Sequence, residues 1–351
     1  MLTSARTPDL AGFLDQIVAA KPHLTDAAKV VVEIAQGAIE LSDLVSRGLL
    51  TGRLDAELDS ANYDGDIQKE LDVFANDLFI NVLQRAGVAH VVSEELQEPL
   101  VLNPGGPLSV AIDPLDGSSN IDANVSIGTI FSILPSLAEA ADLRAHFLQP
   151  GRNQIGSGYV IYGPQTSLVF TLGSGTEIFT LDRREGRFRL AASNVQIPRD
   201  SIEYAINASN YRHWELPVRA FIDDCVLGTD GPLKRNHNMR WIASLVAENY
   251  RILMRGGVFL YPRDQRTRYG EGRLRLVYEA NPIAFLVEQA GGAATDGSDL
   301  ILDIVPAGIH ARVPLVFGSA DSVELIQQYH SDPQFSAEHA PLFGRRGLMR
   351  L

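Results

Sequence analysis

The sequence predicts an α/β (α+β) protein made of two domains or of one large layered unit. Its 351 residues exceed what one simple core holds. Segments whose apolar residues recur at helical spacing alternate with short apolar runs bounded by glycine or proline. Hydrophobic residues make up 45% of the chain, and no apolar run reaches the roughly 18 residues of a membrane helix. We therefore expect a globular protein without a membrane partner.

Charge and cysteine content narrow the class of function. The formal net charge of −13 argues against nucleic acid as a partner and suits an enzyme whose carboxylates bind divalent metal. Cys225 is the single cysteine, which excludes an intramolecular disulfide and a cysteine-based metal site. The first ten residues lack the basic start and apolar stretch of a secretory signal. We expect a cytoplasmic location.

The first half of the chain is predicted to place helices before a sheet. Residues 10–50 form two helices, because apolar residues recur at helical spacing, and a third helix runs to about Gln84 after a turn-rich loop at 62–66. Short alternating segments then predict antiparallel strands. These strands are expected at 124–134, 156–162, 167–172, 177–181 and 188–190.

The second half is predicted to mix strands and helices. Strands are expected at 204–207, 252–261, 273–278 and 313–318. Helices are expected at 216–224, 241–250, 281–289 and 322–329. A domain boundary near 197–200 would give an N-terminal domain (1–197), a C-terminal domain (198–335) and a tail (336–351).

The chemistry gathers in the stretch 109–120. An apolar strand would end at Asp113, where Pro114 cannot donate to the ladder. Asp116 and Gly117 follow, and Ser118, Ser119 and Asn120 then offer hydroxyls, an amide and free backbone N–H groups. Two carboxylates beside small donors suit a hard cation together with a phosphate.

The acids of this stretch allow two interpretations, a surface turn or a functional site. An Asp-Pro-x-Asp-Gly run is often only a surface turn, but here it follows a strand and leads into three small polar residues. The strand 90–93 also ends in acids, Glu94 and Glu95, and such strand ends are where sites gather in open sheets. The eight histidines are scattered, so we expect no histidine nucleophile and interpret His310 as structural or solvated.

The string from Asp113 to Asp122 resembles the signature of class I fructose-1,6-bisphosphatase, within the Mg²⁺- and Li⁺-linked sugar phosphatase superfamily. Further matching stretches lie at 65–77, 92–95, 256–262 and 274–282. The similarity runs from about Thr25 to Tyr329. It implies a five-layer αβαβα sugar-phosphatase fold, a homotetramer, and Mg²⁺ as the cofactor, with Mn²⁺ as an alternative.

The resemblance also implies residue roles. The implied metal ligands are Glu94, Glu95, Asp113, Asp116, Glu279 and the carbonyl of Leu115. Asp72 and Glu95 would orient or deprotonate the attacking water, and Asp66 would belong to a mobile catalytic loop with Asn62 and Arg275. The implied substrate contacts are Asp116, Gly117, Ser118, Ser119, Asn207, Arg240, Tyr261 and Arg273. Arg240 would reach the second phosphate across a subunit interface.

Three departures from the family pattern alter the pocket for the second phosphate. Trp241 stands where the family commonly has tyrosine, and Arg273 stands in place of a lysine. Ala208-Ser209 replaces the usual Glu-Gly. In addition, Pro107-Leu108 occupies the position of the Lys-Tyr pair that binds AMP in many members, which predicts weak or absent AMP inhibition.

The function implied by the resemblance is Mg²⁺-dependent hydrolysis of the C1 phosphate of fructose 1,6-bisphosphate, in carbohydrate metabolism such as gluconeogenesis. One alternative is a dual enzyme of the Calvin cycle that also acts on sedoheptulose 1,7-bisphosphate. A more distant one is an inositol- or nucleotide-phosphate phosphatase. A non-catalytic binding protein on this scaffold is disfavoured, because the acids expected to hold metal are all present.

Overall fold

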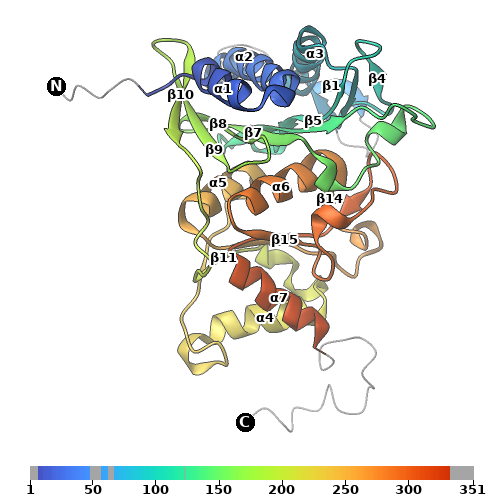
Figure 1. The fold of residues 1–351 in the computed structure, drawn as a ribbon. Coiled ribbons are helices and arrows are strands. Elements are labelled where there is room, and N and C mark those ends of the chain that lie inside the picture. The colour runs from blue at the N-terminus through green and yellow to red at the C-terminus, as the bar shows by residue number, and fades with distance from the viewer. Residues whose placement is uncertain (1–6, 48–56, 62–66, 122, 333–351) are drawn as a thin grey trace, which may run out of the picture.

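The computed structural model describes residues 7–47, 57–61, 67–121 and 123–332 (Figure 1). Its elements stack in the order helices, sheet, helices, sheet, helices (Figure 1). This arrangement confirms the expected five-layer αβαβα fold. Among the described residues, no helix is long and apolar enough to cross a membrane.

The outer helical layer covers one face of the larger sheet. Its members are α1 (Leu10–Ala20), α2 (Thr25–Arg47) and α3 (Glu70–Ala86). The apolar stripe predicted for α2 is fully buried from Val30 to Ala38 and packs in one core with strand residues such as Phe131 and Val160. Burial of this stripe, more than helix propensity, stabilises the helix on the sheet.

The larger sheet has eight strands in the order β10-β9-β8-β7-β6-β5-β3-β4. They are β3 (His90–Ser93), β4 (Leu100–Val101), β5 (Leu108–Asp116), β6 (Ile127–Pro135), β7 (Gly156–Tyr162), β8 (Thr166–Thr171), β9 (Glu177–Asp182) and β10 (Arg187–Ala192). Strands β3 and β5 are parallel, so the chain leaves both at the same sheet edge, while the other neighbours are antiparallel. A separate hairpin pairs β1 (Glu57–Ala61) with β2 (Ile67–Lys69).

The remaining three layers come from the second half of the chain. Helices α5 (Leu245–Arg255) and α6 (Asn281–Gln289) lie between the two sheets (Figure 1). The smaller sheet has the order β12-β11-β13-β17-β15. Its strands are β11 (Glu203–Ala205), β12 (Asn238–Met239), β13 (Val258–Tyr261), β15 (Ala293–Thr295) and β17 (Leu315–Gly318). Helices α4 (Leu216–Leu227) and α7 (Ala320–Ser331) cover its far face.

The core between the sheets contains side chains from both predicted domains. Ile130 and Tyr159 of the larger sheet share one cluster with Val246, Leu286 and Phe317. The boundary near 197–200 stays a prediction, and the predicted tail at 336–351 lies outside the described residues.

The structure corrects one expectation in the signature stretch. Pro114 does not end its strand, because β5 continues to Asp116 through a register shift between Asp113 and Asp116. The shift lets the proline, which has no N–H, stand inside a strand without losing a ladder bond.

Two expected elements of the second half are also wrong. The helix expected at 241–250 begins only at Leu245, after its cap Ser244, and extends to Arg255 into the strand expected at 252–261. The strand expected at 273–278 is limited to β14 (Leu274–Arg275), which pairs with β16 (Arg312–Val313). A π-helical turn (Leu276–Ala280) follows it. Such π turns are rare and are often found at functional sites.

Candidate active site

The two signature acids lie at the end of β5, in its irregular part. Asp113 pairs with Ile130 in β6, and Asp116 pairs with Gly128. Within the bulge, the Leu115 N–H donates to Asp113 Oδ1 at 3.1 Å, and the carbonyl of Pro114 accepts the Thr129 hydroxyl at 2.9 Å. These bonds hold the bulge rigid, so that both carboxylates face one site.

Glu279 joins the two aspartates from the opposite layer. Oxygen atoms of Asp113, Asp116 and Glu279 all lie within 4.8 Å of one another, although the third residue follows the first by more than 160 positions. The side chains are only 2%, 9% and 7% exposed, respectively. The backbone N–H of Arg275, the residue before the π-helical turn that carries Glu279, donates to this carboxylate and orients it.

Burial of three neighbouring acids perturbs their protonation. Burial raises the pKa of Asp113 and of Glu279 well above the ordinary value, and the nearby Glu94 carboxylate raises both further. The pKa of Asp116 rises to about 7 for the same two reasons. Its Oδ2 atom is buried and has no hydrogen-bond partner among the described residues. An all-oxygen set of crowded carboxylates with an unused buried oxygen fits a hard divalent cation.

Two further acids, Glu94 and Glu95, follow β3, and each lies near a different group of side chains. Glu94 lies within hydrogen-bonding reach of Asp113 and its Oε1 is 3.8 Å from Nη2 of Arg275. Burial raises the pKa of Glu95 to about 7, with Asp72 and then Glu94 as further causes. Asp72 is buried in the first turn of α3. The strand end therefore brings Glu94 to the carboxylate cluster and Glu95 to Asp72.

The loop after Asp116 is shaped to bind an anion. Gly117 has φ 77°, which favours glycine, and a short 3₁₀ turn (Ser118–Asn120) follows it. The Asn120 amide donates to the carbonyl of Ala243 at 2.9 Å, and Asp116 accepts the backbone N–H of Val246. The signature loop thus lies against the first turn of α5, where the helix dipole favours negative charge.

Other predicted substrate residues lie around Arg273. Its guanidinium carbon is 5.5 Å from the ring centroid of Tyr261, and its Nη2 is 3.3 Å from Oδ2 of the buried Asp264. The hydrogen bonds of Asn207 go to Ser209. Arg240 has a side chain that is 50% exposed and lies 3.5 Å from Glu203 of its own chain. The described contacts therefore join Tyr261 to Arg273 and leave Asn207 and Arg240 apart from them.

Three residues near Arg273 were not predicted from the sequence: Asp264, Arg266 and Tyr269. Asp264 accepts bonds from Arg266 Nε at 3.0 and 3.2 Å as well as from Arg273, and these bonds outweigh burial and lower its pKa to about 2. The Tyr269 ring lies 3.7 Å from the Arg273 guanidinium and 4.9 Å from that of Arg266. One carboxylate cannot neutralise two guanidinium groups, so positive charge remains. In the sequence, only the arginine-rich run at 263–268 indicates a basic site here.

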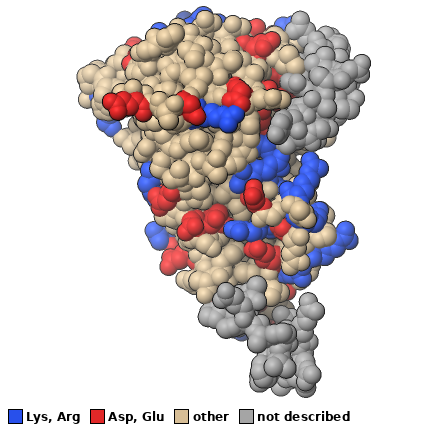
Figure 2. Space-filling view, turned by 90° about the vertical axis from the view of Figure 1, so that its right-hand side faces the viewer, with Lys and Arg blue, Asp and Glu red and all other residues tan. Residues whose placement is uncertain are grey.

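Basic side chains gather on the face that carries β14. Figure 2 shows Lys and Arg side chains clustered over the middle of this face, with acidic side chains beside them. Because the whole chain carries a formal charge of −13, the cluster is a local exception. A local basic surface attracts an anionic ligand that the net charge would repel.

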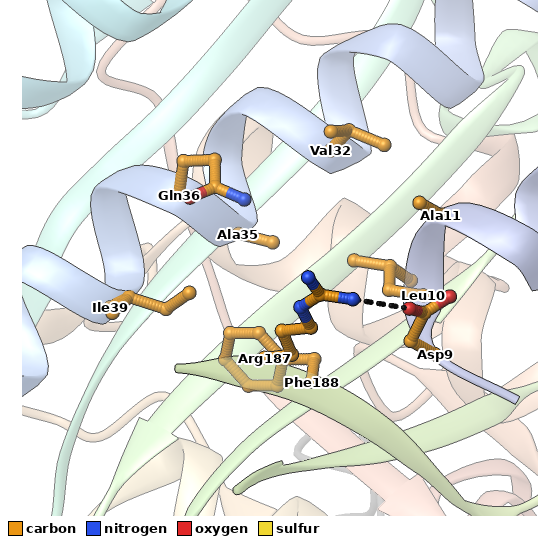
Figure 3. A pocket seen from close by; sticks show the side chains of 9 residues that line it. All are labelled: Asp9, Leu10, Ala11, Val32, Ala35, Gln36, Ile39, Arg187 and Phe188. Atoms are coloured by element: carbon orange, nitrogen blue, oxygen red, sulfur yellow. Dashed lines mark hydrogen bonds and ion pairs between the residues drawn. The ribbon is translucent and has the colours of Figure 1, made fainter. Parts of the chain in front are cut away.

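A cavity of about 300 Å³ lies elsewhere, between α1, α2 and β10 (Figure 3). Its lining is largely apolar, and its ion pair joins Arg187 and Asp9 at 3.3 Å. It contains none of the predicted site residues. Of these residues, Asp66 lies outside the described part of the chain, as does Asn62.

Comparisons with known proteins identify the family. The model for the fructose-1-6-bisphosphatase N-terminal domain matches residues 23–193, and that for the C-terminal domain matches residues 197–331. Class 1 fructose-1,6-bisphosphatases of Nitrobacter hamburgensis and Rhizobium meliloti are each 56% identical to the chain; the alignments cover 92% and 93% of it and 93% of each relative. That of Methylorubrum populi is 53% identical over 99% of the chain and 100% of the relative.

A solved structure agrees with these matches. The crystal structure of Leishmania major fructose-1,6-bisphosphatase in holo form superposes with a TM-score of 0.85 at 32% identity, covering 93% of this chain and 99% of that one. The family models match both halves of the sequence, and the solved structure matches the whole layered fold. The chain therefore belongs to the class 1 fructose-1,6-bisphosphatase family.

Proposed function

We propose that the protein hydrolyses the C1 phosphate of fructose 1,6-bisphosphate, with fructose 6-phosphate and phosphate as products. The observation that carries this proposal is the buried trio of Asp113, Asp116 and Glu279, whose oxygen atoms lie within 4.8 Å of one another. Family membership supplies the substrate, because the relatives compared above are named as fructose-1,6-bisphosphatases.

The family depends on metal, and we propose Mg²⁺ as the ion, with Mn²⁺ as an alternative. The trio would hold it together with Glu94, Glu95 and the Leu115 carbonyl, since hard cations prefer oxygen ligands. When bound, a divalent cation supplies positive charge that neutralises a phosphate dianion and favours attack by water. The raised pKa values of the trio support this assignment, because a bound cation would offset the repulsion among the carboxylates.

The chain's own residues would handle the proton and the phosphate. Glu95, whose pKa is raised to about 7, suits a general base, and Asp72 beside it would help orient the water. Gly117, Ser118 and Ser119 would bind the phosphate that is cleaved, through backbone N–H groups and hydroxyls. A role for Asp66 stays an expectation from the resemblance.

The second phosphate would bind at the other end of the site. Arg273 with Tyr261 would hold it, and the excess positive charge that Arg266 brings supports this assignment. A guanidinium can bind phosphate with two parallel hydrogen bonds, which lysine cannot do. Asn207 would contact the sugar.

We also propose the homotetramer, in which Arg240 reaches a neighbouring subunit. Its support is the edge strand β12, where Met239 is exposed close to the exposed Ile202 and Ile242. An exposed strand edge with apolar side chains is a usual place for subunit contact. A cytoplasmic location stays a proposal that rests on the single cysteine of the sequence.

The names of the relatives do not favour the dual enzyme of the Calvin cycle, and the two sugar bisphosphates share the same reacting end. The test is phosphate release from fructose 1,6-bisphosphate, sedoheptulose 1,7-bisphosphate and inositol 1-phosphate, first with EDTA and then with Mg²⁺ or Mn²⁺ restored. We expect the highest kcat/KM with fructose 1,6-bisphosphate and no turnover in EDTA.

A pair of aspartate variants makes this test specific. Asp116→Ala should abolish turnover, whereas Asp77→Ala should not, because Asp77 is exposed on α3. Full turnover in EDTA, or an active Asp116→Ala enzyme, would contradict the metal mechanism.

A further inference from the structure

Two segments from different layers must keep a fixed spacing for the metal centre to form. The loop after β3 carries Glu94 and Glu95, and the π-helical turn (Leu276–Ala280) carries Glu279. The loop is tied to α3 at its start, where the Glu95 N–H donates to Ser93 Oγ at 3.2 Å and Ser93 donates to Asn76 Oδ1 at 2.8 Å.

His310 lies between the loop and the π-helical turn and reaches both. Its Nδ1 is 2.5 Å from the hydroxyl of Tyr278, the residue before Glu279. Its ring also lies within hydrogen-bonding reach of the backbone of Leu96 and Gln97, which follow Glu95 directly. A carbonyl can only accept, so a neutral ring that donates to the loop from Nε2 would accept the Tyr278 hydroxyl at Nδ1.

The surroundings hold this histidine in place. Tyr278 is fully buried, and its ring meets that of His310 edge to face, with centroids 5.9 Å apart at 70°. Ala311, the next residue, accepts the Leu276 N–H at 2.8 Å. One side of the ring and the backbone next to it are therefore anchored to the π-helical turn.

Arg275 contacts both Tyr278 and Glu94 and so completes a closed set of contacts. Its side chain lies within hydrogen-bonding reach of the Tyr278 hydroxyl, and its Nη2 lies 3.8 Å from Glu94 Oε1. The contacts thus run from Glu94 through Arg275, Tyr278 and His310 back to the loop that carries Glu94. A closed set of contacts resists a change in spacing better than any single bond.

We propose that His310 is a positioning residue for the metal centre, because it links the loop carrying Glu94 and Glu95 to the turn carrying Glu279. The inference rests on the metal centre of the proposed function and extends it to a residue outside the carboxylate cluster. Side chains that orient metal ligands typically change metal affinity or activity by about 10- to 100-fold when they are replaced.

The test is direct Mn²⁺ binding to the purified full-length protein, measured by electron paramagnetic resonance without substrate. His310→Ala removes both bonds and should weaken Mn²⁺ binding by about tenfold or more. Tyr278→Phe removes only the hydroxyl and should cause a smaller loss, and His310→Gln, which can still donate to the loop carbonyls, should recover part of the affinity. His23→Ala is the matched control, since this histidine is exposed far along the chain from the site.

A second measurement separates positioning from general damage. At saturating Mn²⁺, the KM for the sugar bisphosphate should stay within about twofold of wild type in each variant, because His310 contacts no predicted substrate residue. A folded His310→Ala or Tyr278→Phe protein with wild-type Mn²⁺ affinity would overturn the inference and leave the proposed function standing. Mn²⁺ binding that Asp116→Ala leaves unchanged would overturn both.

Discussion

Substituting Gly128 by alanine would test how closely α5 must approach the larger sheet. Gly128 lies in β6 directly opposite Asp116, whose carboxylate accepts the N–H of Val246 in the first turn of α5. An added Cβ would lie 2.6 and 2.7 Å from the two γ-methyl groups of Val246 and 2.8 Å from the carbonyl oxygen of Val160. The missing side chain of Gly128 is therefore what lets the helix reach the signature acid.

The size of the effect follows from these distances. Ordinary contact begins near 3.4 Å, so Val246 and the first turn of α5 must retreat by about 0.8 Å. Overpacking of a tight core costs typically about 1–3 kcal/mol of unfolding free energy. A displacement of about 1 Å at a catalytic site can cost about 10²-fold in rate. We expect Gly128→Ala to lower kcat by between about tenfold and 10²-fold.

The assay combines denaturant unfolding with steady-state kinetics at saturating Mg²⁺. Gly308→Ala is the control, because a Cβ there meets nothing within 4 Å and the backbone is not left-handed. Adding Val246→Ala to Gly128→Ala removes the clashing methyl groups and should return part of the lost kcat, as a double-mutant cycle would record. Wild-type kcat and stability in Gly128→Ala would refute the reasoning.

Three further predictions concern other parts of the molecule. Glu95→Gln should lower kcat by about 10²-fold at saturating Mg²⁺, since a general base is lost, and an unchanged kcat would remove Glu95 from that role. The folded-state pKa of Asp264 is lowered to about 2, so its stabilising contribution is present above about pH 4 and lost as the pH falls toward 2. The difference in unfolding free energy between wild type and Asp264→Asn should accordingly shrink over that range, and a constant difference would contradict the ion-pair account. AMP should inhibit weakly or not at all, because Pro107 and Leu108 offer neither charge nor hydroxyl to a nucleotide phosphate; a titration at subsaturating substrate that showed strong inhibition, not relieved by more substrate, would oppose this.

The sequence by itself determined the layered fold class and the chemistry of the signature. Both depend on short-range order: helical or alternating spacing reports which face of an element is buried, and Asp113, Asp116 and the small donors after them lie within eight positions. Local spacing also placed Glu94 and Glu95 at a strand end, where the structure has them. Glu279, by contrast, was recognised only through the family resemblance, since nothing local distinguishes one acid before a helix.

Tertiary structure alone decided which distant side chains share a site. The bulge that carries β5 past Pro114, the pairing of Asp264 with two arginines, and the contacts of His310 all depend on how layers far apart in sequence pack together. Burial in those layers, not residue type, raises the pKa of Glu95 and of the carboxylate trio. His310, interpreted from the sequence as structural or solvated, lies between the loop after β3 and the π-helical turn, because packing brings together segments that lie more than 180 residues apart in the chain.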